Sequence, residues 1–214
     1  MHFSNRWEVV KFIEEQKIIA IIRAQKTSSL LKVVEALKEG GIQCIEVTMT
    51  TPGALQTLEE IRNTMEDVLF GAGTVLDSET ARQCILSGAQ FLVTPSLNWG
   101  VVEMAHRYDI PIIPGALTPT EILSAWERGA EVVKVFPASS LGPQYIKELK
   151  GPFPQIRLCP TGGIHLDNVE AFLKAGATCV GVGGSLVKSQ FIQEEKWDEL
   201  RKTAEEFSKR VHQQ

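Results

Sequence analysis

Val132-Val133-Lys134-Val135-Phe136-Pro137 is an apolar stretch that one charged residue, Lys134, interrupts. Its length and valine content are typical of a strand buried in a parallel sheet. An ammonium ion inside such a strand loses its hydration, which is costly unless the charge is paired or neutralised. Burial favours the neutral amine, and a neutral amine in a dry pocket attacks carbonyls to form a Schiff base. Taken alone, the stretch fits a structural lysine in a buried ion pair equally well.

Outward from this stretch, short apolar runs alternate with longer helical patterns along the whole chain. We expect eight strands, at residues 18–22, 44–48, 69–72, 91–94, 112–114, 132–136, 156–160 and 179–182. Their starts lie roughly 20 to 26 residues apart, the length of a compact βα unit. Eight such units in succession favour an α/β protein with a (β/α)8 TIM barrel over a doubly wound open sheet.

Two further helices are expected outside the eight units. Residues 4–16 predict an extra N-terminal helix, with Trp7, Val10 and Phe12/Ile13 on one side. The C-terminal residues 196–214 place apolar side chains at helical spacing, which we interpret as core packing. That stripe consists of Trp197, Leu200, Ala204, Phe207 and Val211. Because no linker or low-complexity tract is visible, we expect a single barrel domain over residues 1–214.

Composition narrows the class of protein. The 214 residues carry a net charge of -4 without a basic block, so we expect no nucleic-acid partner. No apolar run approaches the length of a membrane span, and residues 1–5 lack signal-peptide character. The four cysteines form no CxxC pair, and the four histidines show no ligand spacing. We therefore expect a reduced, cytoplasmic protein without disulfides, without a membrane partner and without a metal site.

Three predicted strands carry a charged residue near the C-terminal end, where barrel active sites lie. Arg23 follows residues 18–22 directly, Glu46 lies within residues 44–48, and Lys134 lies in the sixth strand. Three charges of complementary type on three strands predict one functional site. The alternative is a core salt-bridge network, although buried ion pairs are weak sources of stability.

A separate signal points to phosphate. Thr161-Gly162-Gly163-Ile164 follows the seventh strand, and Gly181-Val182-Gly183-Gly184-Ser185-Leu186 spans the end of the eighth. Loops after barrel strands seven and eight often bind phosphate, helped by a short extra helix. Glycines let backbone N–H groups approach an anion, and Ser185 could add a hydroxyl. The alternative is that these glycines only turn the chain.

Other strand ends supply polar pocket candidates. Gly71-Ala72-Gly73-Thr74 follows the third strand and Thr94-Pro95-Ser96 the fourth, with simple turn chemistry as the alternative. Phe136, beside Lys134, could keep the amine dry. His165 follows a Gly-Gly turn, and we interpret it as a surface residue and not as a base.

Together these residues resemble the class I 2-keto-3-deoxy-6-phosphogluconate (KDPG) aldolase family, also called the 4-hydroxy-2-oxoglutarate (KHG) aldolase family. The resemblance covers nearly the whole chain. Its most specific stretches are Glu46-Val47-Thr48, Gly71-Ala72-Gly73-Thr74-Val75, Val133-Lys134-Val135-Phe136-Pro137 and Cys159-Pro160-Thr161-Gly162-Gly163-Ile164. The resemblance implies a homotrimer of (β/α)8 barrels that needs no metal or other cofactor. It also implies that Lys134 forms the Schiff base and that Glu46 is the acid/base.

The resemblance further implies a reaction, the cleavage of KDPG to pyruvate and glyceraldehyde 3-phosphate, with KHG as a second substrate giving pyruvate and glyoxylate. The substrate-binding residues it implies are Arg23, Thr74, Pro95, Phe136, Thr161, Gly162, Gly163, Gly183, Gly184 and Ser185. One position departs from part of the family. Some members carry a carboxylate-binding arginine just after strand two, where this chain has Thr50; others carry it at the end of strand one, where this chain has Arg23.

Three alternatives stay open at this point. An aldolase for 2-keto-3-deoxy-6-phosphogalactonate would act on a substrate that differs only at C4. A phosphosugar isomerase or epimerase would use Glu46 as base and Lys134 as an electrostatic stabiliser. A sugar-phosphate binding module would bind its ligand without turnover, and the three charges at the strand ends would then have no purpose.

Overall fold

Parallel strands dominate the centre of the molecule in the computed structural model, which describes residues 1–23 and 29–213. The strands are β1 (Ile18–Ile22), β2 (Cys44–Thr48), β3 (Leu69–Gly73), β4 (Leu92–Val93), β5 (Ile112–Ile113), β6 (Gly115–Ala116), β7 (Val133–Val135), β8 (Leu158–Pro160) and β9 (Val180–Val182). A six-stranded sheet has the order β5-β4-β3-β2-β1-β9, and a three-stranded sheet has the order β6-β7-β8. Every pairing within them is parallel.

The two sheets adjoin each other at two places. Pro114 alone separates β5, which pairs with β4, from β6, which pairs with β7. Past the end of β8, Thr161 forms an isolated parallel bridge with Gly181 of β9. The chain is therefore an α/β protein with a curled parallel sheet.

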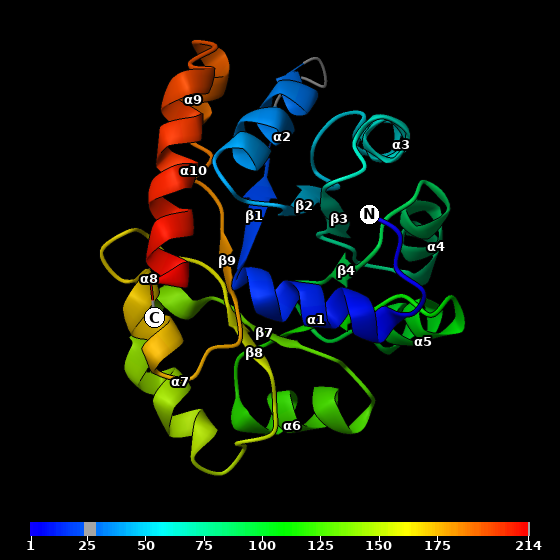
Figure 1. Cartoon of the computed structure of the whole chain (residues 1–214). Helices are drawn as coiled ribbons and strands as arrows, with labels where there is room; N and C mark the ends of the chain where they lie inside the picture. The colour runs from blue at the N-terminus through cyan, green and yellow to red at the C-terminus, as the bar shows by residue number, and fades with distance from the viewer. Residues whose placement is uncertain (24–28, 214) are drawn as a thin grey trace.

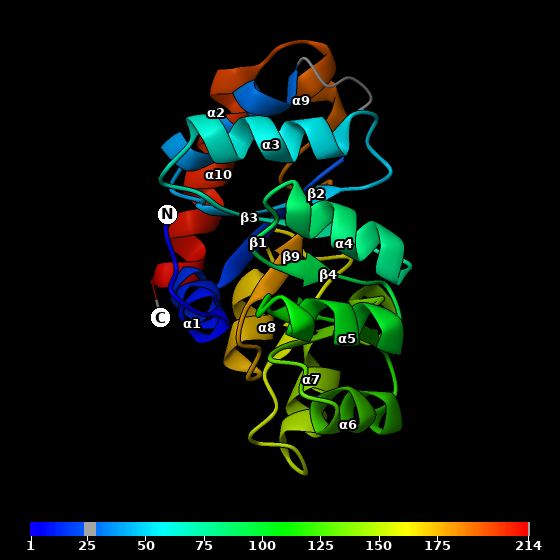
Figure 2. The same cartoon turned by 90° about the vertical axis from the view of Figure 1, so that its right-hand side faces the viewer.

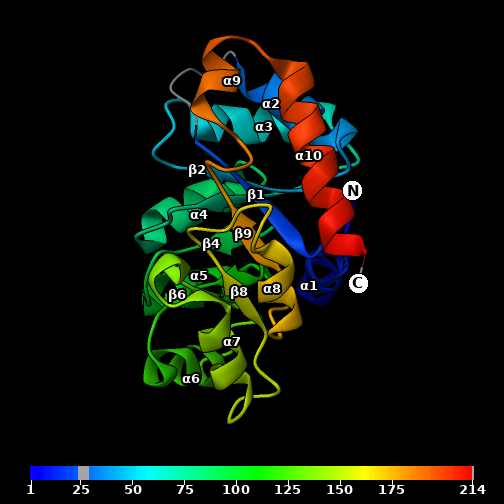
Figure 3. The same ribbon diagram turned by 90° about the vertical axis from the view of Figure 1, so that its left-hand side faces the viewer.

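Helices cover the outside of this sheet. Their bounds are α1 (Arg6–Gln16), α2 (Leu30–Glu39), α3 (Ala54–Thr64), α4 (Ser78–Leu86), α5 (Trp99–Arg107), α6 (Pro119–Glu127), α7 (Gly142–Lys150), α8 (Val169–Lys174), α9 (Ser189–Gln193) and α10 (Trp197–His212). Figure 1 shows α1 lying across the strands, and Figure 2 shows α3, α4, α5 and α6 following one another along one side. On the other side α10 packs against α2 and α8 (Figure 3). None of the described helices is long and apolar enough to cross a membrane.

Alternation along the strands produces two apolar cores. In β1, Ile18, Ala20 and Ile22 join the core between strands and helices, whereas Ile19 faces the inside of the curl. The inner core also takes side chains from the other strands or from residues next to them: Cys44, Leu69, Phe91, Val93, Ile113, Val132, Cys159 and Cys179. Helix α1 adds Val9, Val10 and Ile13 to it, so α1 closes one end of the curl.

Most predicted elements are confirmed, with shifted ends. The bounds of β1 and β2 agree with the expectation. The strand expected at 112–114 ends at Ile113 as β5, and β6 begins after Pro114, because proline has no N–H for the ladder. The predicted stripe of α10 is buried except for Trp197, which is partly exposed. Helix α1 begins at Arg6, where Asn5 caps it. Val10 and Ile13 are buried, whereas Trp7 on the same side of the helix is 51% exposed.

The burial of the cysteines and the glycines at the helix ends agree with what the sequence predicts. All four cysteines are buried free thiols. Glycines at the ends of four helices, Gly41, Gly88, Gly129 and Gly176, have positive φ angles between 83° and 104°. This left-handed conformation is the one that glycine adopts without steric cost, and it reverses the chain into the next strand.

A buried carboxylate fastens α1 to the rest of the molecule. The side chain of Glu131, just before β7, has no solvent exposure. Its Oε2 accepts a hydrogen bond from Ile112 N at 3.0 Å, and its Oε1 lies 3.1 Å from Arg6 Nε and 3.5 Å from His106 Nε2. Burial raises the pKa of Glu131, while the Ile112 N–H group and the charges of His106 and Arg6 lower it.

We predict that Arg6→Met destabilises the protein, because it leaves a buried carboxylate without its cation. Breaking such a pair costs about 3 kcal/mol. Urea unfolding at pH 8 should show this loss, and the loss should shrink as the pH is lowered through the raised pKa of Glu131, because protonation removes the buried charge. Lys11→Met is the control, because its ion pair with Glu15 is exposed on both sides. Equal effects of the two substitutions would contradict the anchoring role.

Candidate active site

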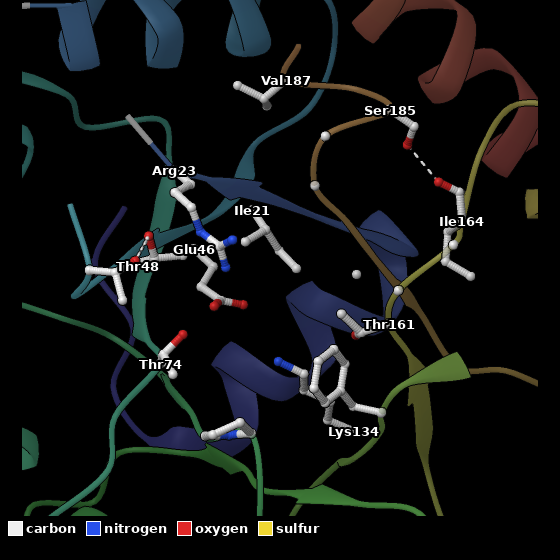
Figure 4. A pocket seen from close by; sticks show the side chains of 18 of the residues that line it. Ile21, Arg23, Glu46, Thr48, Thr74, Lys134, Thr161, Ile164, Ser185 and Val187 are labelled. Atoms are coloured by element: carbon white, nitrogen blue, oxygen red, sulfur yellow. Dashed lines mark hydrogen bonds between the residues drawn. The ribbon is translucent and has the colours of Figure 1, made fainter. Parts of the chain in front are cut away.

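A pocket of about 870 Å³ opens at the carboxyl ends of the strands. Every residue that the sequence predicted for the site lines it: Arg23, Glu46, Thr74, Pro95, Lys134, Phe136, Thr161, Gly162, Gly163, Gly183, Gly184 and Ser185. Figure 4 shows the Lys134 amine and the Glu46 carboxylate pointing into the same cavity from opposite sides, with Arg23 above Glu46. The strands thus bring together side chains that are more than 100 residues apart in sequence.

Lys134 lies in the middle of β7, between Gly115 of β6 and Cys159 of β8. The residue is 7% exposed, and its Nζ lies 4.9 Å from the ring centroid of Phe136. Among the described residues, no ion pair joins any two of Arg23, Glu46 and Lys134. The alternative of a core salt-bridge network is therefore wrong, and the amine faces the pocket without a carboxylate bound to it.

Glu46 occupies the middle of β2 and is 3% exposed. Burial raises the pKa of its carboxyl group, while the positive charges of Lys134 and Arg23 lower it by smaller amounts. The net direction is upward. A carboxyl group with a raised pKa can both take and return a proton closer to neutral pH, which is the property that general acid–base catalysis requires.

We predict that Glu46 makes stability fall as pH rises, because its folded pKa lies above the unfolded value of 4.5. Below the unfolded pKa the carboxyl group is protonated in both states and costs nothing. As pH rises through the folded pKa, the folded state must hold a buried charge. Glu46→Gln removes this cost. The free energy of unfolding of the variant, minus that of the wild type, should therefore grow above pH 4.5 and level off above the folded pKa.

Glu103→Gln is the matched control, since this side chain is exposed on α5. Urea titrations at a series of pH values would measure both differences. A Glu46→Gln difference that stays flat across the whole range would contradict the raised pKa.

Arg23, Thr48 and Thr50 line one side of the pocket, which we call the upper wall. Arg23 directly follows β1 and directs its guanidinium toward Glu46 (Figure 4). Thr48 Oγ1 lies 3.1 Å from Thr51 Oγ1, and Thr50 donates to Thr48 Oγ1 at 3.2 Å. The Thr50 hydroxyl is thus used within this threonine group, and the positive charge on this wall comes from Arg23.

The glycine-rich loops form the other end of the pocket. Gly162 and Gly163 have φ angles of 95° and 71°, so the turn itself requires glycine there. Gly183 and Gly184 differ, because a Cβ at Gly183 would find its nearest neighbour 3.9 Å away and a Cβ at Gly184 would find none within 4 Å. Packing does not explain these two glycines, and the space above them is free for a ligand.

Ser185 lines the pocket between the two glycine-rich loops. Its hydroxyl donates to the carbonyl oxygen of Ile164 at 2.5 Å and thereby joins the two glycine-rich loops (Figure 4). The helix that follows, α9, begins only at Ser189 and has five residues.

The remaining predicted residues line the space between the two ends. Thr161 is 6% exposed and donates to the carbonyl oxygen of Cys159 at 3.3 Å, while Phe136 is 38% exposed at the mouth. His165 lies on the rim with an exposed side chain, which confirms that it is a surface residue. Among the described residues, no group of three or more His, Cys, Asp or Glu side chains could hold a metal ion.

Sequence reasoning missed some of the lining. Ile21, Thr48 and Gly181 face the pocket, as do Pro52, Val187 and Ser189. Strand alternation could have identified Thr48, because it lies two residues after Glu46 on β2 and therefore shares its face. Val187 and Ser189 lie beyond the last strand, where no periodicity marks them.

Fold and site together define the class: an α/β protein with a curled parallel sheet, whose pocket combines a lysine amine and a carboxylate at strand ends. Residues 9–203 match the KDPG and KHG aldolase family, and the chain belongs to that family. The 2-dehydro-3-deoxy-phosphogluconate aldolase of Treponema pallidum is 39% identical over 186 residues, which cover 86% of this chain and 88% of that protein.

Two further relatives bear on the chemistry. The 2-dehydro-3-deoxy-6-phosphogalactonate aldolase of Escherichia coli is 34% identical over 174 residues, covering 80% of this chain and 85% of that one. The KDPG aldolase of Legionella pneumophila was solved with pyruvate captured at low pH as a covalent carbinolamine intermediate. It superposes with a TM-score of 0.86 and 32% identity, over 92% of this chain and 96% of that one.

Proposed function

We propose that this chain is a class I aldolase that cleaves KDPG to pyruvate and glyceraldehyde 3-phosphate, with KHG as a second substrate. One observation carries the proposal: a nearly buried lysine amine, free of any described ion pair, faces the pocket with a buried carboxylate opposite. The covalent pyruvate adduct of the Legionella relative supports the same chemistry.

In the proposed mechanism Lys134 attacks the C2 carbonyl of the substrate and forms a carbinolamine. Loss of water gives a protonated imine, which withdraws electrons from the neighbouring carbons. Glu46 takes the proton from the C4 hydroxyl, the C3–C4 bond breaks, and its electron pair moves into the imine to give an enamine. Protonation of the enamine at C3 and hydrolysis then release pyruvate. Proton transfer by a placed carboxylate typically contributes ~10²–10⁴-fold to the rate.

The two ends of the pocket suit the two ends of the substrate. Arg23 and Thr161 hold the carboxylate next to the carbonyl carbon, and Thr74, Pro95 and Phe136 line the pyruvate portion. The phosphate lies against the glycine-rich loops at Gly162, Gly163, Gly183, Gly184 and Ser185. Because the Ser185 hydroxyl donates to Ile164, its contribution there is to hold the two loops together.

The galactonate-type substrate is the second candidate. The observation that favours it is the similarity to the Escherichia coli aldolase for 2-dehydro-3-deoxy-6-phosphogalactonate. The two substrates differ only at C4, whose hydroxyl is the group that Glu46 deprotonates. A turnover assay on both C4 epimers, with pyruvate release as the readout, decides between them.

The proposal extends to the whole molecule. The two sheets are parts of one (β/α)8 barrel spanning residues 1–214 as a single domain, in which β5 and β6 are halves of one strand. The Thr161–Gly181 bridge and the inner core support closure of the barrel.

The family resemblance supports a cytoplasmic homotrimer that binds small molecules and needs no metal. Sedimentation of the purified protein measures the assembly.

We predict that pyruvate and borohydride together add a stable adduct to Lys134, located by mass spectrometry. Lys134→Arg should abolish both the adduct and turnover, because arginine keeps the charge but cannot form the imine. Lys147→Arg, on the helix α7, is the control and should retain both. An isomerase, an epimerase or a simple binding module would trap no pyruvate, and an adduct on another lysine would overturn the assignment.

We predict that Arg23→Lys lowers kcat/KM sharply for the natural 2-keto acid. Arginine can donate two parallel hydrogen bonds to a planar carboxylate, which orients the adjacent carbonyl toward the amine. For a substrate whose carboxylate is replaced by a neutral amide, the deficit should be much smaller. Both enzymes are assayed on both substrates. Equal deficits would show that Arg23 acts on Glu46 and not on the substrate carboxylate.

A further inference from the structure

Gly73 ends β3, the strand next to the one that carries Glu46. Its backbone is not in the left-handed region, so no turn requires glycine at this position. Glycine inside a buried strand also weakens it, because it adds backbone entropy and no packing. The sequence feature therefore needs another explanation.

The explanation lies in the neighbouring side chain. Glu46 is paired with Gly71, and Gly73 lies two residues further along the same face of β3. A Cβ atom built on Gly73 would overlap Oε1 of Glu46 and lie 2.6 Å from its Cδ and 3.0 Å from its Cγ. The carboxylate thus lies directly over the bare Cα of Gly73.

No polar contact among the described residues orients the Glu46 carboxylate. Within residues 1–23 and 29–213, no hydrogen bond or ion pair reaches the oxygen atoms of Glu46. The charges of Lys134 and Arg23 act on it only over longer distances. The position of the carboxylate is consequently set by packing, and Gly73 supplies the space.

Gly181 and Thr161, in the same pocket, are related in the same way as Gly73 and Glu46. A Cβ on Gly181 of β9 would overlap Thr161 Oγ1 and lie 3.1 Å from its Cγ2. Gly71 differs, because there a Cβ would meet the ring of Phe91 at 2.5 Å, in the apolar inner core and away from the pocket. Gly73 and Gly181 therefore accommodate polar side chains of the site, whereas Gly71 accommodates a core side chain.

We infer that Gly73 is a positioning residue for the proposed aldol cleavage, which it serves by letting the Glu46 carboxylate lie where it reaches the C4 hydroxyl. The inference rests on the proposed function. A methyl group at position 73 would push Glu46 Cδ outward by roughly an ångström, and a misplacement of this size can cost about 10²-fold in rate.

The test is Gly73→Ala, assayed for KDPG cleavage and for borohydride trapping of pyruvate. We expect kcat to fall about 10²-fold, while KM stays within about threefold and trapping at Lys134 persists. The acid limb of the kcat/KM pH profile should also move, because the environment of Glu46 changes. Gly71→Ala, on the same strand, should lower stability in urea unfolding without moving that limb.

A double-mutant cycle with Glu46→Ala makes the test specific. Once the Glu46 side chain is gone, Gly73→Ala should change the residual kcat by less than about threefold. If the two losses instead multiply, Gly73 acts independently of Glu46 and the inference is overturned. If Gly73→Ala alone does not fold, Glu46→Ala should restore folding, and failure to do so would also overturn it.

The outcomes separate this inference from the proposed function. A wild-type protein that traps no pyruvate contradicts the aldolase proposal itself. A wild-type protein that traps pyruvate, with a Gly73→Ala variant that retains full kcat and an unchanged pH profile, contradicts only the role of Gly73.

Discussion

The constraint on which the site depends is that two groups of opposite charge are buried in one cavity and kept apart. Direct contact would neutralise both and leave a structural ion pair. Lys134 and Glu46 instead project from β7 and β2 into a shared space, and each is less than one-tenth exposed. A substrate carbonyl fits between an amine and a carboxylate held in this way. The fold therefore has to maintain a gap that the charges themselves would tend to close.

Two features of the fold maintain that gap. Below the site, the inner core packs apolar side chains from the strands against α1. At the level of the site, glycines on β3 and β9 leave room beside the functional side chains. Filling this space with apolar side chains would make the protein more stable, because buried apolar surface contributes favourably to folding. The unfilled layer is the structural requirement for a substrate site.

The sequence predicted most of this because its signals are local. The apolar runs of β1 and β2 set their bounds, and single charges within such runs or directly after them identified Arg23, Glu46 and Lys134. Three features escaped because they depend on contacts between distant residues. Pro114 separates β5 from β6 in the other sheet, the Ser185 hydroxyl binds Ile164, and Gly73 lies under Glu46. None of these contacts leaves a periodic pattern in the sequence.

The position of the cation on the upper wall follows from the same geometry. Thr50 lies two residues beyond the end of β2, and its hydroxyl donates to Thr48 within the threonine group. Arg23 comes from the adjacent strand β1, whose Ile21 is paired with Glu46. From there the guanidinium still lies above Glu46 and lowers its pKa against the effect of burial. A cation at the end of one strand can thus act on a carboxylate of the neighbouring strand, because parallel strands bring their carboxyl ends to one edge.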